Sequence, residues 1–213
     1  MSPPLEPPLG RSSKVAPLLA AWLACVTAGF LVLAVYEKQP GPSADAPSDW
    51  PAGCALPPPA GRHVLVMFGH PHCPCTRASM SELERIAART RGRLDVHVVF
   101  YADRALGDGW ERGDLWEQAT AIPHARVWSD PEGVLAGRFD ARTSGQALVY
   151  APDGRLVFRG GITGSRGHAG DNEGKNAVLD LVQGGEPESD GTPVFGCALS
   201  SIPGELETAG GRP

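Results

Sequence analysis

The chain has 213 residues, of which 42% are hydrophobic, and this is enough for one domain with its own core and additional segments. Its formal net charge of −5 argues against nucleic acid as a partner, because such proteins carry a basic surface. The 27 glycines and 21 prolines lie mostly outside the apolar runs, which is typical of a compact domain between irregular segments.

The N-terminal part of the chain predicts a single membrane anchor. Residues 15–36 carry no charge and follow a Pro-rich polar segment, 1–14. As a helix they would be roughly 33 Å long, enough to cross a bilayer, whereas a cleaved signal peptide has a shorter apolar run. Arg11 and Lys14 precede the run and no net charge follows it. The positive-inside rule therefore predicts a cytoplasmic segment 1–14 and a soluble domain in the periplasm, outside a bacterial inner membrane.

The segments on either side of the predicted domain differ from it in composition. Residues 37–61 contain seven prolines among Ser, Ala and Gly, which predicts an extended, semi-rigid linker. The alternation of apolar and turn-forming stretches between them places the domain at 62–184. The chain after it is rich in Gly, Pro and acidic residues, and we expect a flexible C-terminal tail at 185–213.

A strand followed closely by two cysteines and a helix is the most informative stretch. Residues 63–68 form a β-branched and apolar run that predicts a buried strand. After the cysteines, apolar residues recur at helical spacing, which predicts an amphipathic helix with Glu82 on its solvent face. The apolar positions are Met80, Leu83, Ile86 and Ala87.

Cys73 and Cys75 therefore lie where this strand leads into the helix. The unpaired N–H groups and the dipole at a helix N-terminus stabilise a thiolate, and Pro74 is suited to a first helical turn. We predict a partly exposed, nucleophilic Cys73 with Cys75 as its partner.

The remaining elements follow from the same signals. Two strands flank an Asp-Gly turn and predict a hairpin, and a last helix begins at Asp171 or Asn172 and ends before Gly184. The predicted elements after the first helix are a strand at 94–101, a helix at 114–120, a short strand at 126–128, a helical turn or two at 131–139 and the hairpin strands at 146–151 and 156–160.

The order of these elements, with Cys73 and Cys75 between the first strand and helix, resembles the thioredoxin superfamily. The resemblance implies an α/β, thioredoxin-like fold, a central mixed sheet flanked by helices. The stretch from 129 to 156 is similar to that of membrane-anchored TlpA-like and Sco-like members, and the motifs His-Pro-His-Cys-Pro-Cys and Thr-Pro-Val-Phe-Gly-Cys are most similar to bacterial RedB-type proteins. The active-site stretch differs in having one residue between the cysteines and no Trp before them.

The same resemblance implies a substrate groove beside the cysteines. Superfamily members have a cis-proline before the third strand of the fold, facing the cysteines, and this chain has Ser144 and Gly145 at the matching place. We expect Pro74, Ser144 and Gly145 to line this groove.

Four cysteines lie beyond the predicted anchor, and their number leaves three pairings open. We favour Cys54–Cys197 as a structural disulfide, with Cys73 and Cys75 as the working pair. In the competing assignment Cys197 resolves a mixed disulfide on Cys73.

The histidines near the cysteines support two readings. His72 can tune the Cys73 thiolate as an imidazolium or a proton shuttle. Alternatively, thiolate and imidazole groups suit Cu(I), and Sco-like copper chaperones use this fold. The ligands would come from His70, His72, Cys73, Cys75 and His168.

The sequence thus predicts a membrane-anchored, periplasm-facing thiol–disulfide oxidoreductase that needs no cofactor. Its partners would be protein thiols or disulfides in the periplasm. A copper chaperone is the alternative function, and copper would then be the metal bound.

Overall fold

The computed structural model describes residues 15–42 and 45–199, so the predicted segment 1–14 and residues 200–213 of the predicted tail lie outside the described residues. The chain divides into two units, one ending at Glu37 and one beginning at Lys38. Each is described by itself.

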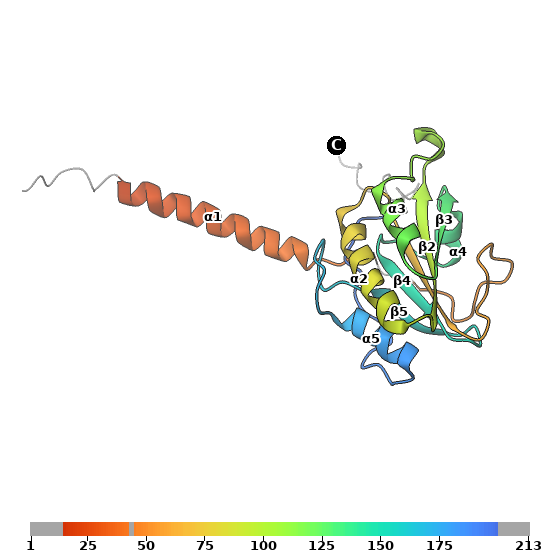
Figure 1. Cartoon of the computed structure of the whole chain (residues 1–213). Helices are drawn as coiled ribbons and strands as arrows, with labels where there is room; N and C mark the ends of the chain where they lie inside the picture. The colour runs from red at the N-terminus through yellow and green to blue at the C-terminus, as the bar shows by residue number, and fades with distance from the viewer. Residues whose placement is uncertain (1–14, 43–44, 200–213) are drawn as a thin grey trace, which may run out of the picture. The chain divides into compact units, whose positions relative to one another are not determined.

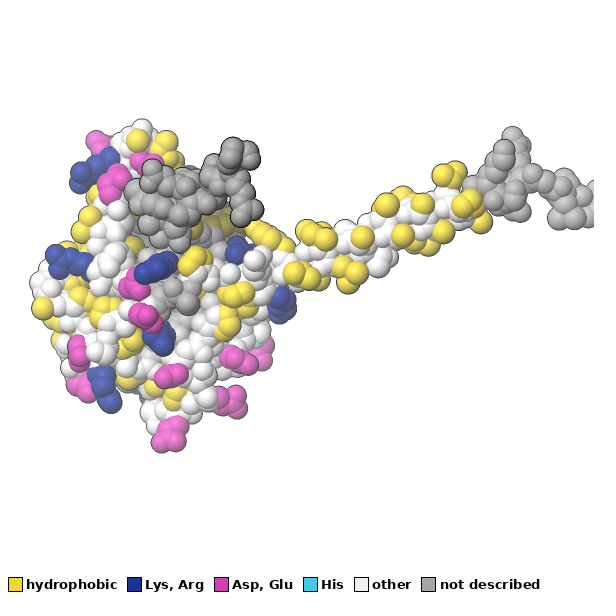
Figure 2. All heavy atoms as spheres, turned by 180° about the vertical axis from the view of Figure 1, so that it is seen from behind, with side chains coloured by type: hydrophobic (Ala, Val, Ile, Leu, Met, Phe, Trp, Pro, Cys, Tyr) yellow, Lys and Arg dark blue, Asp and Glu magenta, His cyan; other side chains and the backbone are white. Residues whose placement is uncertain are grey.

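The first unit contains one helix, α1 (Val15–Glu37), of 23 residues. None of its side chains is buried, and Figure 2 shows apolar side chains along its whole length on the face in view. Its 23 residues and apolar composition are those of a helix that can cross a membrane, as the sequence predicts.

The second unit is built on a five-stranded mixed sheet in the order β3-β2-β1-β4-β5 (Figure 1). The central strand β1 pairs in parallel with β2 and antiparallel with β4, while β3 extends the parallel side and β5 the antiparallel side. The strands are β1 (His63–Gly69), β2 (Leu94–Ala102), β3 (Ala125–Pro131), β4 (Gln146–Tyr150) and β5 (Leu156–Gly161).

Helices cover both faces of this sheet. The apolar residues of α2 (Pro74–Thr90), α3 (Asp114–Ala121) and α5 (Glu173–Gln183) share one core cluster, and those of α4 (Val134–Arg138) lie in the other. A short 3₁₀ helix, η1 (Arg104–Leu106), follows β2. This arrangement confirms the predicted α/β, thioredoxin-like fold.

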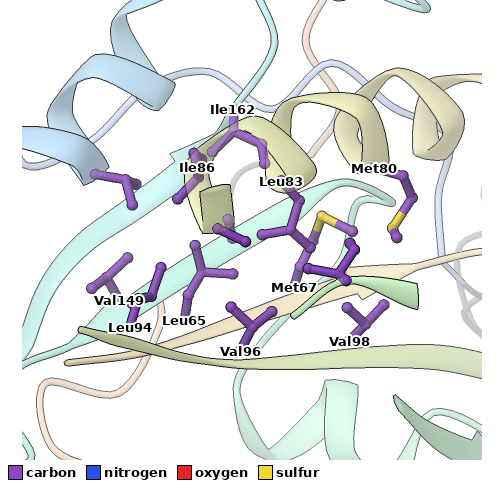
Figure 3. Packing of buried hydrophobic residues seen from close by; sticks show 14 of the residues in the cluster. Leu65, Met67, Met80, Leu83, Ile86, Leu94, Val96, Val98, Val149 and Ile162 are labelled. Atoms are coloured by element: carbon purple, nitrogen blue, oxygen red, sulfur yellow. The ribbon is translucent and has the colours of Figure 1, made fainter. Parts of the chain in front are cut away.

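Alternation along β1 divides the core into two layers, since successive strand side chains point to opposite faces. Leu65 and Met67 pack with Met80, Leu83 and Ile86 of α2 (Figure 3). The intervening side chains join the opposite layer, whose members include Phe139 after α4, Leu56 from the Pro-rich segment and Leu199. Buried apolar side chains thus pack on both faces of β1, the strand that leads into the cysteine turn.

The Pro-rich segment lies against the domain. The Trp50 ring packs on Phe139 and Tyr150 with centroid distances of 5.4 and 5.1 Å, and Leu56 is 1% exposed. The N–H of Gly41 donates to the carbonyl of Val194 at 2.8 Å. The extended, semi-rigid linker predicted from the sequence thus packs on the domain through the apolar side chains between its prolines, which local composition does not reveal.

The chain after α5 also returns to the domain. We call residues 190–199 the C-terminal strap. Its first part pairs with the edge strand β5, where Arg159 donates to the carbonyl of Asp190 at 2.9 Å and Thr192 donates to that of Arg159 at 3.2 Å. The strap thus covers an open sheet edge, which differs from the flexible tail that its composition predicts.

Candidate functional site

Cys73 lies at the start of α2, as the N-cap residue in an extended conformation, and Pro74 is the first helical residue. Proline suits this position because its fixed φ matches the helix and no N–H is wasted. The strand-to-helix junction predicted from the sequence is therefore formed, with the helix N-terminus directed at the cysteine turn.

Both cysteines of the turn are more buried than the sequence predicts. Cys73 is 4% exposed and Cys75 is 6% exposed, whereas we expected a partly exposed Cys73. The strap passes directly beside Cys73, a contact with a segment more than 100 residues away that no local pattern contains.

The strap places a third cysteine at the site. The Sγ atoms of Cys73 and Cys197 are 3.3 Å apart, within hydrogen-bond distance. Cys197 is held by its backbone, since the N–H of Ser144 donates to the Cys197 carbonyl at 2.8 Å. The favoured Cys54–Cys197 disulfide is not formed. Cys54 remains a free thiol, with its Sγ accepting a hydrogen bond from the Leu56 N–H at 3.3 Å.

Hydrogen bonds at the turn make Cys73 the most acidic of the three thiols. Burial alone would raise the pKa of Cys73, but the backbone N–H groups of Cys197, Thr76 and Cys75 and the Cys197 thiol lower it to about 7. Burial and the neighbouring Cys73 raise the pKa of Cys197 to about 11 and that of Cys75 in the same direction. Cys73 is therefore the most readily ionised of the three thiols, and once it is ionised the Cys197 thiol is the donor between them.

Ser144 and Thr76 fix the turn to the start of β4. The Ser144 Oγ accepts from the backbone N–H of His70 at 2.9 Å and lies 2.5 Å from the Thr76 hydroxyl, which donates to the His70 carbonyl. Gly145 adopts a φ of +93° and donates to the Phe68 carbonyl at 2.8 Å. Of the predicted groove residues, Ser144 and Gly145 thus contact the turn and its strand, and Pro74 starts the helix beside them.

The two histidines of the turn pack on aromatic side chains. His70 stacks on Tyr101 with a centroid distance of 6.1 Å, and the Trp110 ring lies 5.3 Å from His70 and 4.7 Å from His72. Burial, followed by the charge of His72, lowers the pKa of His70. The hydrogen bonds that lower the pKa of Cys73 do not include one from His72, and the tuning role of His72 stays a prediction.

Two hollows border these groups. One of about 210 Å³ is lined by His72, Cys73, Pro74, Arg77 and Asp114, among others, and offers a small reagent a path to Cys73. The other, of about 260 Å³, lies between the aromatic pair Tyr101 and Trp110 and the strap. Two larger hollows, of about 580 and 600 Å³, lie away from the three cysteines.

The donor atoms proposed for copper are not arranged to hold a metal. No group of three or more His, Cys, Asp or Glu side chains in residues 15–42 and 45–199 is placed for this. His70 Nδ1 already accepts the N–H of His72 at 3.2 Å, and His168 Nδ1 lies 2.8 Å from the carbonyl of Arg166. The residues present do not fit the metal site that the Sco-like resemblance implies.

Sequence reasoning missed a buried ion pair behind the turn. Glu82, expected on the solvent face of α2, is fully buried; its Oε2 lies 3.3 Å from Lys175 Nζ and its Oε1 accepts the N–H of Gly170 at 2.7 Å. The ion pair links α2 to α5, and the hydrogen bond from Gly170 links Glu82 to the loop before α5. In the same loop the backbone of Gly167 forms a hydrogen bond with Cys75. The position of Glu82 four residues before the core residue Ile86 is the signal that indicates burial.

Sequence comparison leaves the family open: no protein-family model matches the chain, and no curated protein matches it. The chain is similar to solved structures of an uncharacterized conserved protein from Geobacillus kaustophilus (18% identity, 78% of this chain and 93% of that chain, TM-score 0.57) and a hypothetical protein from Sinorhizobium meliloti (20%, 78% and 96%, TM-score 0.58). A structure described as a putative thiol:disulfide interchange protein DsbE from Chlorobium tepidum also matches (18%, 66% and 96%, TM-score 0.43). At these identities the first two structures show a shared fold, and function must be argued from the site.

Proposed function

We propose that this protein is a thiol–disulfide oxidoreductase in which Cys73 is the attacking thiolate. The single observation that supports this most strongly is the placement of Cys73, with a pKa of about 7, at a helix start and 3.3 Å from a second thiol. A thiolate near its pKa at neutral pH combines ionisation with nucleophilicity, which is the optimum for exchange.

The chemistry follows from two successive exchanges. The Cys73 thiolate attacks one sulfur of a protein disulfide, forms a mixed disulfide and releases the other sulfur as a thiolate, which takes up a proton. A second thiol of the site then loses its proton and attacks the Cys73 sulfur, releasing the substrate's remaining thiol. The substrate gains two electrons, the site retains an intramolecular disulfide, and an external dithiol must reduce it; the reverse sequence oxidises a dithiol substrate.

Two thiols compete for the resolving role. Cys75 is the predicted partner, and Cys197 is the competing assignment made from the sequence. The contact between the Cys73 and Cys197 sulfurs favours Cys197, since in this structure the two atoms already lie 3.3 Å apart. A Cys197→Ser variant that accumulates mixed disulfides while Cys75→Ser does not would assign the role to Cys197; the converse would assign it to Cys75.

The proposed place of action is the periplasmic side of a bacterial inner membrane. The support is α1, which can cross a membrane, together with the basic residues Arg11 and Lys14 before it. An oxidising compartment supplies protein disulfides as substrates. The finer likeness to TlpA-like and RedB-type proteins stays a prediction, and the site geometry gives no support to the copper alternative.

The test is exchange by the full chain in detergent. We expect the pre-reduced chain to reduce a peptide disulfide with one turnover per reduced site when no further reductant is added and with many turnovers when dithiothreitol is present. Cys73→Ser should abolish both, whereas Cys54→Ser, outside the site, should retain them. Equal rates for Cys73→Ser and the unmodified chain would contradict the proposal.

A further inference from the structure

The part of the C-terminal strap nearest the cysteines is held as a β-strand would be. Leu199 donates to the carbonyl of Arg142 at 2.9 Å and Ser144 donates to that of Cys197 at 2.8 Å, with Thr143 and Ala198 as an antiparallel bridge between them. These two backbone hydrogen bonds involve no side chain of the strap, so another extended chain with a glycine at the place of Gly196 would form them as well.

The side chains of this part are used in two ways. Cys197 directs its sulfur at Cys73, at 3.3 Å. Leu199, two residues on, is 3% exposed in the core layer that includes Phe68 and Phe139, and it also borders the hollow beside Tyr101 and Trp110. Two residues of one short extended segment thus have separate contacts: Cys197 places its sulfur beside that of Cys73, and Leu199 inserts its side chain into the core.

Access to Cys73 depends on this strap. Cys73 is 4% exposed, and the hollow of about 210 Å³ beside it admits a small disulfide but not an extended protein segment. The strand edge at 142–144, which would orient such a segment, is already occupied by the strap.

From these contacts we infer that the C-terminal strap is an internal substrate mimic, and that the substrate is an extended peptide segment with a cysteine followed two residues later by an apolar side chain. The inference rests on the proposed function. The substrate pairs with 142–144 in place of the strap, its disulfide sulfur takes the place of Cys197 Sγ, and its apolar side chain takes the place of Leu199. Return of the strap brings the Cys197 thiol to the Cys73 sulfur; it loses its proton, forms the Cys73–Cys197 disulfide and releases the substrate thiolate, which is protonated.

The closeness of Gly196 to the site offers a variant that displaces the strap and leaves every thiol in place. A Cβ at Gly196 would lie 1.9 Å from the carbonyl oxygen of Ser144, so Gly196→Ala must push the strap away from the 142–144 edge. Gly137, in α4, has nothing within 4 Å of the same built atom, and Gly137→Ala is the matched control. Leu199→Ala releases the other end of the strap and serves if Gly196→Ala folds poorly.

The experiment compares two probes on the full chain in detergent at pH 7, with the product on Cys73 identified by mass spectrometry. One probe is a peptide with the sequence of residues 194–199, its cysteine carried as a mixed disulfide with nitrothiobenzoate. The other is the small disulfide dithiobis-nitrobenzoate. We expect Gly196→Ala and Leu199→Ala to raise the peptide rate about tenfold or more, because releasing two hydrogen bonds raises the open fraction by at least that factor, and to change the small-disulfide rate less than about twofold.

The outcomes separate the two proposals. A peptide with Asp in place of its last Leu should lose the gain, and Gly137→Ala should react like the unmodified chain. Equal acceleration of both probes, or no acceleration of the peptide, would overturn the substrate-mimic inference and leave the proposed function standing. No reaction of the small disulfide with Cys73 in any variant would overturn the proposed function and this inference with it.

Discussion

The sulfur atom of Cys73 lies 3.3 Å from that of Cys197, although the two residues are 124 positions apart in the chain. Long-range packing, in addition to the Cys-Pro-Cys spacing, therefore places a second thiol beside Cys73. Sequence spacing alone places Cys75 nearest to Cys73 and leaves Cys197 to pair with Cys54.

Mild oxidation of the full chain should produce a Cys73–Cys197 disulfide first. The sulfurs are already in contact, and a pKa of about 7 leaves Cys73 partly ionised at neutral pH. Peptide mapping by mass spectrometry identifies the bond, and Cys75→Ser and Cys54→Ser should leave its yield unchanged. A Cys54–Cys197 link as the main product would contradict this expectation.

Alkylation of Cys73 should follow a pKa of about 7. At pH 6 its rate with iodoacetamide should exceed that of an unperturbed thiol about tenfold, since the gain in thiolate is partly offset by lower intrinsic nucleophilicity. Cys197→Ala removes one hydrogen-bond donor to the thiolate, so the midpoint of the pH profile should move upward. An unchanged midpoint would show that the Cys197 thiol does not stabilise the thiolate.

Burial of His97 should make the domain less stable in mild acid. Burial and then the charge of Arg126 lower the pKa of this histidine from 6.5 to about 4, and its Nδ1 accepts the Trp128 indole N–H at 3.1 Å. The folded state therefore binds fewer protons than the unfolded state, and stability is complete above pH 6.5 and falls as the pH drops toward 4.

The expected loss attributable to His97 at pH 5 is about 2 kcal/mol relative to pH 7. Urea unfolding at the two pH values measures it. His97→Gln retains an acceptor for Trp128 but does not titrate. Between pH 7 and pH 5 its free energy of unfolding should therefore fall by about 2 kcal/mol less than that of the unmodified protein. Identical pH dependence in both proteins would exclude His97 as the cause.

Lys175→Met should destabilise the protein by about 2–3 kcal/mol, because the buried Glu82 carboxylate loses its ammonium partner and keeps the Arg85 guanidinium and the Gly170 N–H. Arg62→Ala is the control. Arg62 pairs with Asp95, but its side chain is 51% exposed, and a loss of at most about 1 kcal/mol is expected. Urea unfolding of both variants measures the two losses of stability. Similar losses in Lys175→Met and Arg62→Ala would contradict a special role of the buried ion pair.

A reporter fused after the last residue should be active outside the cytoplasm. Alkaline phosphatase fused there should be active in intact bacteria, while a fluorescent protein that folds only in the cytoplasm should be dark. Reversal of the charge bias by Arg11→Glu and Lys14→Glu should reduce phosphatase activity, since by the positive-inside rule these two residues favour a cytoplasmic N-terminus. Phosphatase inactivity in the unmodified fusion would refute the proposed topology.

Local signals predicted the scaffold well. The uncharged run predicted α1 to within one residue, and the strand before Cys73 was expected at 63–68 and is observed as His63–Gly69. Asn172 caps α5 by accepting the Lys175 N–H at 2.8 Å, at one of the two predicted starts. Such signals depend on hydrophobic period and on caps, which the neighbouring residues determine.

The site was less predictable because long-range contacts complete it. The burial of Cys73, the position of Cys197 and the seating of Leu199 all come from a segment whose composition resembles that of a flexible tail. Glu82 was placed on the wrong face because a charged residue is assumed to be solvated unless its partner is known, and Lys175 lies 93 positions further on.

Gly196 leaves no room for a side chain beside the Ser144 carbonyl oxygen. Any partner strand that follows the same path must also lack a side chain immediately before its cysteine. Most cysteines in secreted proteins do not follow a glycine, so the Cβ of the preceding residue would clash with the Ser144 carbonyl oxygen and prevent binding. The range of protein substrates that fit this groove would be narrow, and each would contain the dipeptide Gly-Cys.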